Sequence, residues 1–226
     1  QSEDPLMVYS GKGLKRAVDD VVKSYEHKYQ IPVSVVYAGS NTLLTTIQET
    51  HVGDIFIAGS KPYIKKLDNL VKHSQYLVKH VPVFIVRKNN FKNIKTYDDL
   101  LNEKVSIAIG NKDMAAVGRV AEAIAEISKK SADFSQNITT QATTVNVLLE
   151  LVNTSKVDAA IVWEDMLTWK TSDNLEIIRI PNQINQVKEV WVATLNTTND
   201  LERSKHFFDY IKSDGIKFFE KHGFIQ

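Results

Sequence analysis

The sequence contains no cysteine, and this absence excludes disulfide bonds, thiolate metal sites and cysteine nucleophiles together. It also lacks any apolar run near the roughly 20 residues that a membrane-spanning helix requires. Neither sign of charge is in excess, because 28 Lys and Arg residues face 27 Asp and Glu residues. No basic stripe with interleaved aromatic residues indicates a nucleic-acid partner. The 226 residues, 43% of them apolar, are instead typical of a globular protein of one or two domains.

Motifs for catalysis and for cation binding are also missing. The six histidines lie far apart, and no two of them form the i, i+4 pair of a helical zinc site. Lys12 follows a glycine, as in a phosphate loop, but the earlier glycine and the Ser or Thr after the lysine are absent. There is no Gly-x-Ser-x-Gly nucleophile elbow, and the carboxylate pairs Asp19-Asp20 and Asp98-Asp99 are typical of a solvated surface. We therefore expect no enzyme, no bound cofactor and no site for a bare metal cation.

Strand and helix patterns alternate along the chain. Short apolar runs end in small residues and are followed by segments whose apolar residues recur every three or four positions, as in an amphipathic helix. Such alternation predicts an α/β fold with mainly parallel sheets. The expected strands cover residues 6–9, 32–37, 54–58, 81–86, 105–109, 157–163, 177–180 and 190–195, and the expected helices cover 14–29, 42–50, a segment through 71, 116–127, 145–152 and 201–219.

Four of the predicted helix starts have a similar composition of Gly, Ser, Thr, Asn and Ala. They are Ser10 to Gly13, Gly39 to Asn41, Ala115 to Gly118, and Thr143 to Val145. Because the carboxyl ends of parallel strands gather in one crevice, these loops can converge. A helix start offers unpaired N–H groups and a partial positive charge, which suit an anion. Turns and helix caps need the same residue types, so no single loop is specific. The coincidence of four loops favours an anion site.

A set of segments spread over the chain carries a further signal. They are Val8-Tyr9 followed by a small-residue loop and Leu14, Tyr37 to Leu43 with Ile47, Gly53 to Ala58, Ile107 to Gly110 with Gly118, Val145 eighteen residues before Trp163, and Phe208 to Phe224. In this order and spacing they resemble the periplasmic molybdate-binding proteins of ABC importers. The resemblance implies an α/β protein with the two-lobed type II periplasmic binding protein fold. It also implies an extracytoplasmic protein that captures molybdate or tungstate for a membrane permease.

The resemblance also implies a set of ligand-binding residues. That family holds its tetrahedral dianion with two serine loops, two amides at helix starts and often a tyrosine hydroxyl. The second serine corresponds to Ser40, next to Asn41, and the amides correspond to Val117 and Val145.

Two positions depart from that pattern. The first serine position falls on Gly13, which offers only its amide, so that Ser10 or Lys12 would have to compensate. Gly11 of the same loop is also expected to contact the ligand. The tyrosine position falls on Trp163, whose indole N–H is a donor in a different place. The alternative interpretation of Trp163 is an aromatic residue of the core.

The expected domain organisation follows from the same resemblance. We expect lobe I to comprise residues 1–83 and 188–226 and lobe II to comprise 84–187, with crossings near Pro82 and Val187. The ligand would lie between the lobes and favour a closed state. The chain opens with Gln1 to Pro5, without Met or a signal-peptide pattern. This start is consistent with a removed export signal and a periplasmic or cell-surface location.

Other functions remain compatible with these patterns. Glycine-rich first loops and a tryptophan in the last ligand strand also resemble the accessory colonisation factor group, which implies a small organic or phosphorylated acid as ligand. Sulfate is a further candidate anion. The same fold serves as the effector-sensing part of transcription regulators, although no helix-turn-helix segment is found here.

Overall fold

The computed structural model of the chain describes residues 4–226. Residues 1–3, on which the expectation of a removed export signal partly depends, lie outside the described residues. The described chain divides into two compact units, which we call lobe I (residues 4–80 and Lys188–Gln226) and lobe II (Val81–Val187). Lobe I is therefore built from both ends of the sequence, whereas lobe II is one continuous segment. None of the helices in the described residues is long and apolar enough to cross a membrane.

Lobe I has a five-stranded sheet in the order β2-β1-β3-β10-β4. β1 is parallel to both of its neighbours, and β10 is antiparallel to β3 and to β4. Four strands thus run in one direction, and only β10, the strand by which the chain returns to lobe I, runs in the other. Their bounds are β1 Leu6–Gly11, β2 Val33–Ala38, β3 Ile55–Ala58, β4 Val71–His80 and β10 Lys188–Leu195.

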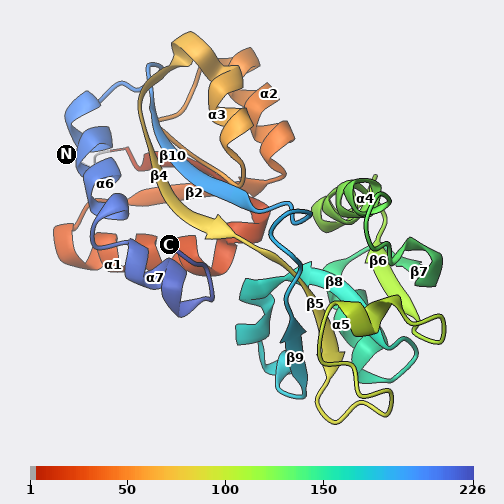
Figure 1. The fold of residues 1–226 in the computed structure, drawn as a ribbon. Coiled ribbons are helices and arrows are strands. Elements are labelled where there is room, and N and C mark those ends of the chain that lie inside the picture. Colours follow the sequence, from red (N-terminus) through yellow and green to blue (C-terminus); the bar gives the residue numbers. More distant parts are fainter. Residues whose placement is uncertain (1–3) are drawn as a thin grey trace. The chain divides into compact units, whose positions relative to one another are not determined.

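Helices cover both faces of the lobe I sheet (Figure 1). One apolar cluster joins the sheet to α1, α6 and α7, and a second cluster joins the opposite face to α2 and α3. Alternate residues of β10 belong to different clusters, as the two-residue period of a strand requires. The helices are α1 Lys15–Tyr29, α2 Ser40–Thr50, α3 Lys61–Leu67, α6 Leu201–Lys212 and α7 Ile216–Lys221.

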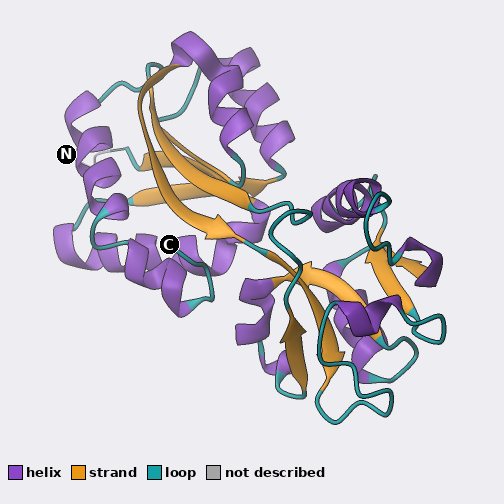
Figure 2. Cartoon of the chain, in the orientation of Figure 1, coloured by secondary structure: helices purple, strands orange, loops and turns teal. Residues whose placement is uncertain are grey.

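Lobe II repeats the same plan in the order β7-β6-β8-β5-β9. β6 is parallel to β7 and β8, while β5, the first strand after the chain leaves lobe I, is antiparallel to β8 and β9. Figure 2 shows these strands with their helices. The elements are β5 Pro82–Arg87, β6 Ile107–Gly110, β7 Ile138–Ala142, β8 Ala159–Trp163, β9 Leu175–Ile178, α4 Ala116–Ser128 and α5 Val145–Asn153.

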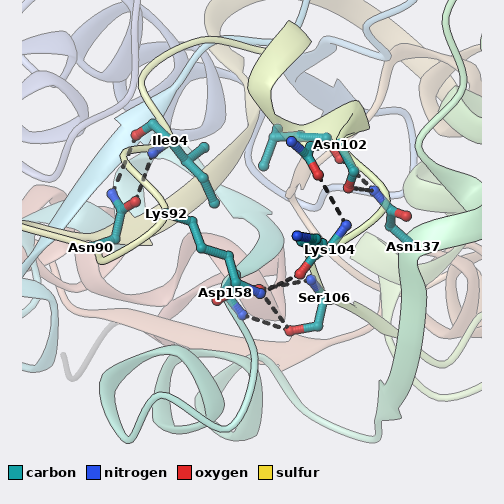
Figure 3. A network of polar contacts seen from close by, with 9 residues as sticks. Asn90, Lys92, Ile94, Asn102, Lys104, Ser106, Asn137 and Asp158 are labelled. Atoms are coloured by element: carbon teal, nitrogen blue, oxygen red, sulfur yellow. Dashed lines mark hydrogen bonds and ion pairs between the residues drawn. The ribbon is translucent and has the colours of Figure 1, made fainter.

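A polar network fixes the amino ends of β6 and β8 (Figure 3). One carboxylate oxygen of Asp158 accepts hydrogen bonds from the backbone N–H of Ser106 at 2.8 Å and from Lys92 at 2.6 Å. Asn137 is buried and donates from its amide nitrogen to the carbonyls of Leu100 and Asn102, both at 2.8 Å. The Asp158 contacts hold the starts of β6 and β8, and the Asn137 contacts hold the start of β7. The position of each start also determines where the carboxyl end of that strand lies.

The expected alternation of strands and helices is confirmed, but two strands were not predicted. The segment through residue 71 was expected to be helical throughout, whereas α3 ends at Leu67 and β4 begins at Val71. β7 was also missed. Both are edge strands with one strand neighbour each, and residues 72–75 of β4 are exposed and mostly polar. An edge strand of this kind lacks the apolar run on which the prediction depended.

Candidate functional site

Three adjacent strands of lobe I end at the same edge of the sheet and bring three loops together. Gly11 is the last residue of β1, Ser40 begins α2 after β2, and Gly59 follows β3. The backbone N–H of Gly59 donates to the Ser40 hydroxyl oxygen at 3.4 Å. A β-carbon at Gly11 would lie 3.2 Å from that same oxygen, so glycine keeps the space beside the hydroxyl open. We call Gly11, Ser40 and Gly59 the lobe I loop cluster.

The other predicted residues of lobe I lie around this cluster in different environments. Ser10 is fully buried within β1, and its hydroxyl donates to the Gly11 carbonyl at 3.2 Å. Gly13 lies in the 3₁₀ turn before α1, where a β-carbon would be 3.9 Å from the His80 ring. Asn41 is the exposed second residue of α2. The structure therefore brings Gly11 and Ser40 together and encloses Ser10 in the sheet.

Lobe II presents the same arrangement at the carboxyl ends of β7, β6 and β8. Val117 is the second residue of α4, which follows β6, and Val145 is the first residue of α5, which follows β7. The two loops are joined because the backbone N–H of Asn111 donates to the Ala142 carbonyl at 2.7 Å. Trp163 is the last residue of the third strand, β8. We call the Val117, Val145 and Trp163 positions the lobe II loop cluster.

A close approach of backbone atoms positions the start of α4. A β-carbon added at Gly118 would lie 2.5 Å from the Gly110 carbonyl oxygen and 2.5 Å from the carbonyl carbon of Asn111. Real side chains do not tolerate such distances, so glycine lets the first turn of α4 pack directly on the end of β6. This packing places the helix-start amides at the strand ends.

The helix starts differ in how their backbone donors are used. Thr144 precedes α5, and its side chain accepts a hydrogen bond from Val147 N at 3.3 Å. Gly39 before α2 and Ala115 before α4 provide no side-chain cap. Because the first N–H groups of a helix have no partner within it, these starts present hydrogen-bond donors and a partial positive charge. Such donors suit an oxyanion.

Trp163 is 8% exposed and belongs to the core cluster of lobe II. Its Cα partner across the sheet is Pro82 of β5. The residue thus combines the two interpretations given by the sequence, since it ends a strand at the expected edge and also packs in the core. Its contact with a ligand stays a prediction.

One pair of charges near the end of β2 is neutralised. The Tyr37 hydroxyl near the end of β2 donates to Asp19 at 2.5 Å, and Lys15 bonds the same carboxylate group at 2.8 Å. Burial makes the largest contribution to raising the pKa of Tyr37 far above its usual value, and the bond to Asp19 adds to it. The phenol therefore stays neutral. Among residues 4–226, no group of three or more His, Asp or Glu side chains could hold a metal ion.

Sequence reasoning did not select Gly59 or Asn111, which join the loops of lobe I and lobe II respectively. Gly59 followed a predicted strand, and Asn111 followed Gly110 at the end of another, so the position of each was visible in the sequence. Their bonding partners were not, because a backbone N–H has no side-chain signature.

Comparison with known families settles the class of the protein. The family described as bacterial extracellular solute-binding protein matches residues 6–225. The chain belongs to this solute-binding family. A relative from Haemophilus influenzae, described as a binding protein, is 31% identical over 223 residues and is matched over 97% of this chain and 90% of its own length.

Solved structures with this fold include several solute-binding proteins. The substrate-binding domain described for a molybdenum ABC transporter of Clostridium difficile has a TM-score of 0.85 at 20% identity, over 98% of both chains. PEB3 of Campylobacter jejuni, solved with L-phospholactate, has a TM-score of 0.72 at 18% identity, over 98% of this chain and 99% of its own. The periplasmic molybdate-binding protein of Azotobacter vinelandii has a TM-score of 0.71 at 12% identity, over 98% of this chain and 99% of its own.

These likenesses confirm the predicted type II periplasmic binding protein fold and the resemblance to the molybdate-binding group. Membership of the solute-binding family assigns the chain to a class of extracellular binding proteins. Molybdenum, L-phospholactate and molybdate are named for the three solved structures above and are properties of those proteins.

Proposed function

We propose that this protein is the solute-binding component of an ABC importer and captures a tetrahedral oxyanion, molybdate or tungstate, without turning it over. The observation that carries the proposal is the pair of loop clusters, one in each lobe, at which three adjacent strands end beside helix-start amides. Membership of an extracellular solute-binding family supports export, for which we propose a removed signal peptide. The partner would be the membrane permease of the importer.

In the proposed complex, one ligand is held by both lobes. Lobe I would contribute Ser40 and Asn41 together with Ser10, Gly11 or Gly13, and lobe II would contribute the amides of Val117 and Val145 and the indole N–H of Trp163. These donors are neutral. A fully formed ion pair in a dry site is costly to separate, whereas dipolar donors hold an anion that must later be released. We propose hinges at the crossings near His80 and Val187, so that ligand binding favours closure.

A small phosphorylated acid is the second candidate ligand. The glycine at position 13 and the tryptophan at position 163 replace hydroxyl donors of the molybdate-binding pattern. PEB3, which shares the fold, was solved with L-phospholactate. A phosphate monoester presents three oxygens of a tetrahedral dianion, where molybdate presents four, so both candidates would use the same loop clusters.

A thermal-shift screen followed by calorimetry tests the proposed function. Molybdate, tungstate, sulfate, inorganic phosphate and phospholactate are each added to the intact chain. A true ligand at 100 times its dissociation constant should stabilise the protein by about 2.7 kcal/mol. We expect molybdate and tungstate to bind most tightly. Preference for phospholactate would select the second candidate, and no stabilisation by any of these anions would contradict anion capture.

A further inference from the structure

Two aromatic side chains of lobe I carry polar atoms that the fold does not use. Tyr76 of β4 and Trp191 of β10 are partners across the sheet, with ring centroids 6.4 Å apart in an edge-to-face arrangement. Both side chains are only partly buried, but the Tyr76 hydroxyl and the Trp191 indole nitrogen are shielded from solvent. Within residues 4–226, neither atom has a hydrogen-bond partner.

Leaving such donors unpaired is unfavourable. A buried donor without a partner costs about 1–3 kcal/mol, and phenylalanine would fill either position without that penalty. Burial, followed by the negative charge of Glu189, raises the pKa of Tyr76, so its hydroxyl keeps the proton and can donate. A buried polar group without a partner in the fold calls for an explanation, and a ligand, an ion or an ordered water can supply the bond.

Lys61 adds a positive charge to the same place. It is the first residue of α3, and its ammonium nitrogen lies 4.5 Å from the centre of the Trp191 ring. In the described part of the chain, this ammonium group contacts the Trp191 ring and is not paired with a carboxylate. The positive charge of Lys61 and two neutral donors therefore lie around the Trp191 ring, and the negative charge of Glu189 acts on Tyr76.

This group adjoins the lobe I loop cluster. Trp191 is the cross-strand partner of Ala58, the residue before Gly59, and the Gly59 amide bonds the Ser40 hydroxyl. Lys61 follows Gly59 by two residues, which corresponds to at most about 8 Å of backbone. Lys61 and Trp191 are thus both close in the chain or in the sheet to the residues that follow β3.

We propose that Lys61, Tyr76 and Trp191 form a second anion subsite in lobe I, which takes the carboxylate of a ligand whose tetrahedral head lies at the lobe I loop cluster. A carboxylate has two acceptor oxygens, which match one O–H and one N–H donor beside an ammonium group. A bare tetrahedral oxyanion has no arm to occupy this subsite. The inference rests on the proposed function, since it assumes an anion at Ser40, and it concerns the second candidate ligand, a phosphorylated carboxylic acid.

Calorimetry on the whole chain with phospholactate and inorganic phosphate tests the subsite. We expect wild type to bind phospholactate more tightly than phosphate, because only phospholactate carries the carboxylate. Tyr76→Phe removes one donor and keeps the ring, whereas Trp191→Phe replaces the indole by a smaller ring without a donor. Each should weaken phospholactate binding about tenfold. Lys61→Ala removes the charge and should reduce the preference for phospholactate as well.

Thermal unfolding separates a binding role from a structural one. Tyr76→Phe removes a hydroxyl without a partner, so its melting temperature should equal or exceed that of wild type. The matched control is Tyr97→Phe in lobe II, where the hydroxyl donates to the Ala132 carbonyl at 2.8 Å. That variant should melt lower and bind phospholactate normally.

The outcomes distinguish the subsite from the proposed function. If wild type binds molybdate or phosphate but phospholactate affinity is the same in Tyr76→Phe and Trp191→Phe, the two donors serve only the fold or an internal water, and the subsite is wrong. The subsite is also wrong if wild type binds phospholactate no more tightly than phosphate. If wild type binds none of these anions, the proposed function fails and the subsite fails with it.

Discussion

Ser40 joins two loops of lobe I, because its hydroxyl oxygen accepts from Gly59 and lies beside Gly11. Ser40→Ala should weaken molybdate binding, or phospholactate binding if that is the ligand, by about 1–3 kcal/mol, since a desolvated anion loses one donor. The fold should be unaffected, because the bond from Gly59 is long at 3.4 Å. Calorimetry measures the change, with Thr45→Ala one turn later on α2 as the control. Unchanged affinity in Ser40→Ala, combined with loss in Ser10→Ala, would show that the serine loops were assigned wrongly.

Individual residues were predictable where one local rule decides their role. The segment Thr143 to Val145 was predicted to start a helix because its residue types are typical of helix caps, and the Thr144 side chain does accept a hydrogen bond from Val147 N. Ser10 was expected in an open loop. Instead β1 continues to Gly11 and buries it, because pairing with β2 and β3 extends the strand beyond its apolar run. That extension depends on partners far away in the sequence, which local patterns do not reveal.

At the scale of elements, the contact between α4 and β6 decides where the Val117 amide lies. Gly118→Ala should lower the free energy of unfolding by about 1–3 kcal/mol, because the new methyl group overlaps backbone atoms of Gly110 and Asn111. It should also weaken anion binding, since the first turn of α4 must move. Urea unfolding and calorimetry measure the two effects. Gly39→Ala is the control for stability, because a β-carbon there would meet nothing within 4 Å. Equal stability of wild type and Gly118→Ala would contradict the close packing.

Elements were recognised in proportion to how much apolar surface they bury. α1 was predicted because its buried residues recur every three or four positions. The edge strands β4 and β7 were missed because each pairs with a strand on one side only and carries polar residues. β4 holds Tyr76, so the same polar character that concealed the strand also concealed part of the proposed subsite.

At the scale of the whole molecule, contacts between the two sequence segments complete lobe I. Burial is the largest single effect on the pKa of Asp20 on α1 and acts to raise it. The hydrogen bonds from His222 and Lys221 together outweigh burial and hold that pKa below its usual value. A carboxylate with a lowered pKa stabilises the fold at pH values above about 3.9, which is its pKa in the unfolded chain. This contribution is lost as the pH falls through the lower pKa of the folded state.

Asp20→Asn should therefore lower the free energy of unfolding at pH 7 and leave less dependence on pH in the acid range. Urea unfolding at neutral pH and near pH 3 measures this, and the two proteins should become more alike in acid. Asp214→Asn is the control, because the Lys28 and Asp214 side chains of that pair are about half exposed, and exposed pairs contribute little. Parallel pH profiles for wild type and Asp20→Asn would show that the bonds from His222 and Lys221 do not affect stability.

The position of β10 in the lobe I sheet has a consequence for the order in which the protein acquires its structure. β10 lies between β3 and β4, yet it follows the whole of lobe II in the sequence and therefore leaves the ribosome after residues 81–187. Until β10 is available, β4 lacks its neighbouring strand and also the bridge between Lys79 and Ile225, so the sheet stays incomplete. Lobe II needs only residues 81–187. All residues of the lobe II loop cluster are therefore available for folding while the lobe I sheet, at whose edge the lobe I loop cluster lies, still lacks β10.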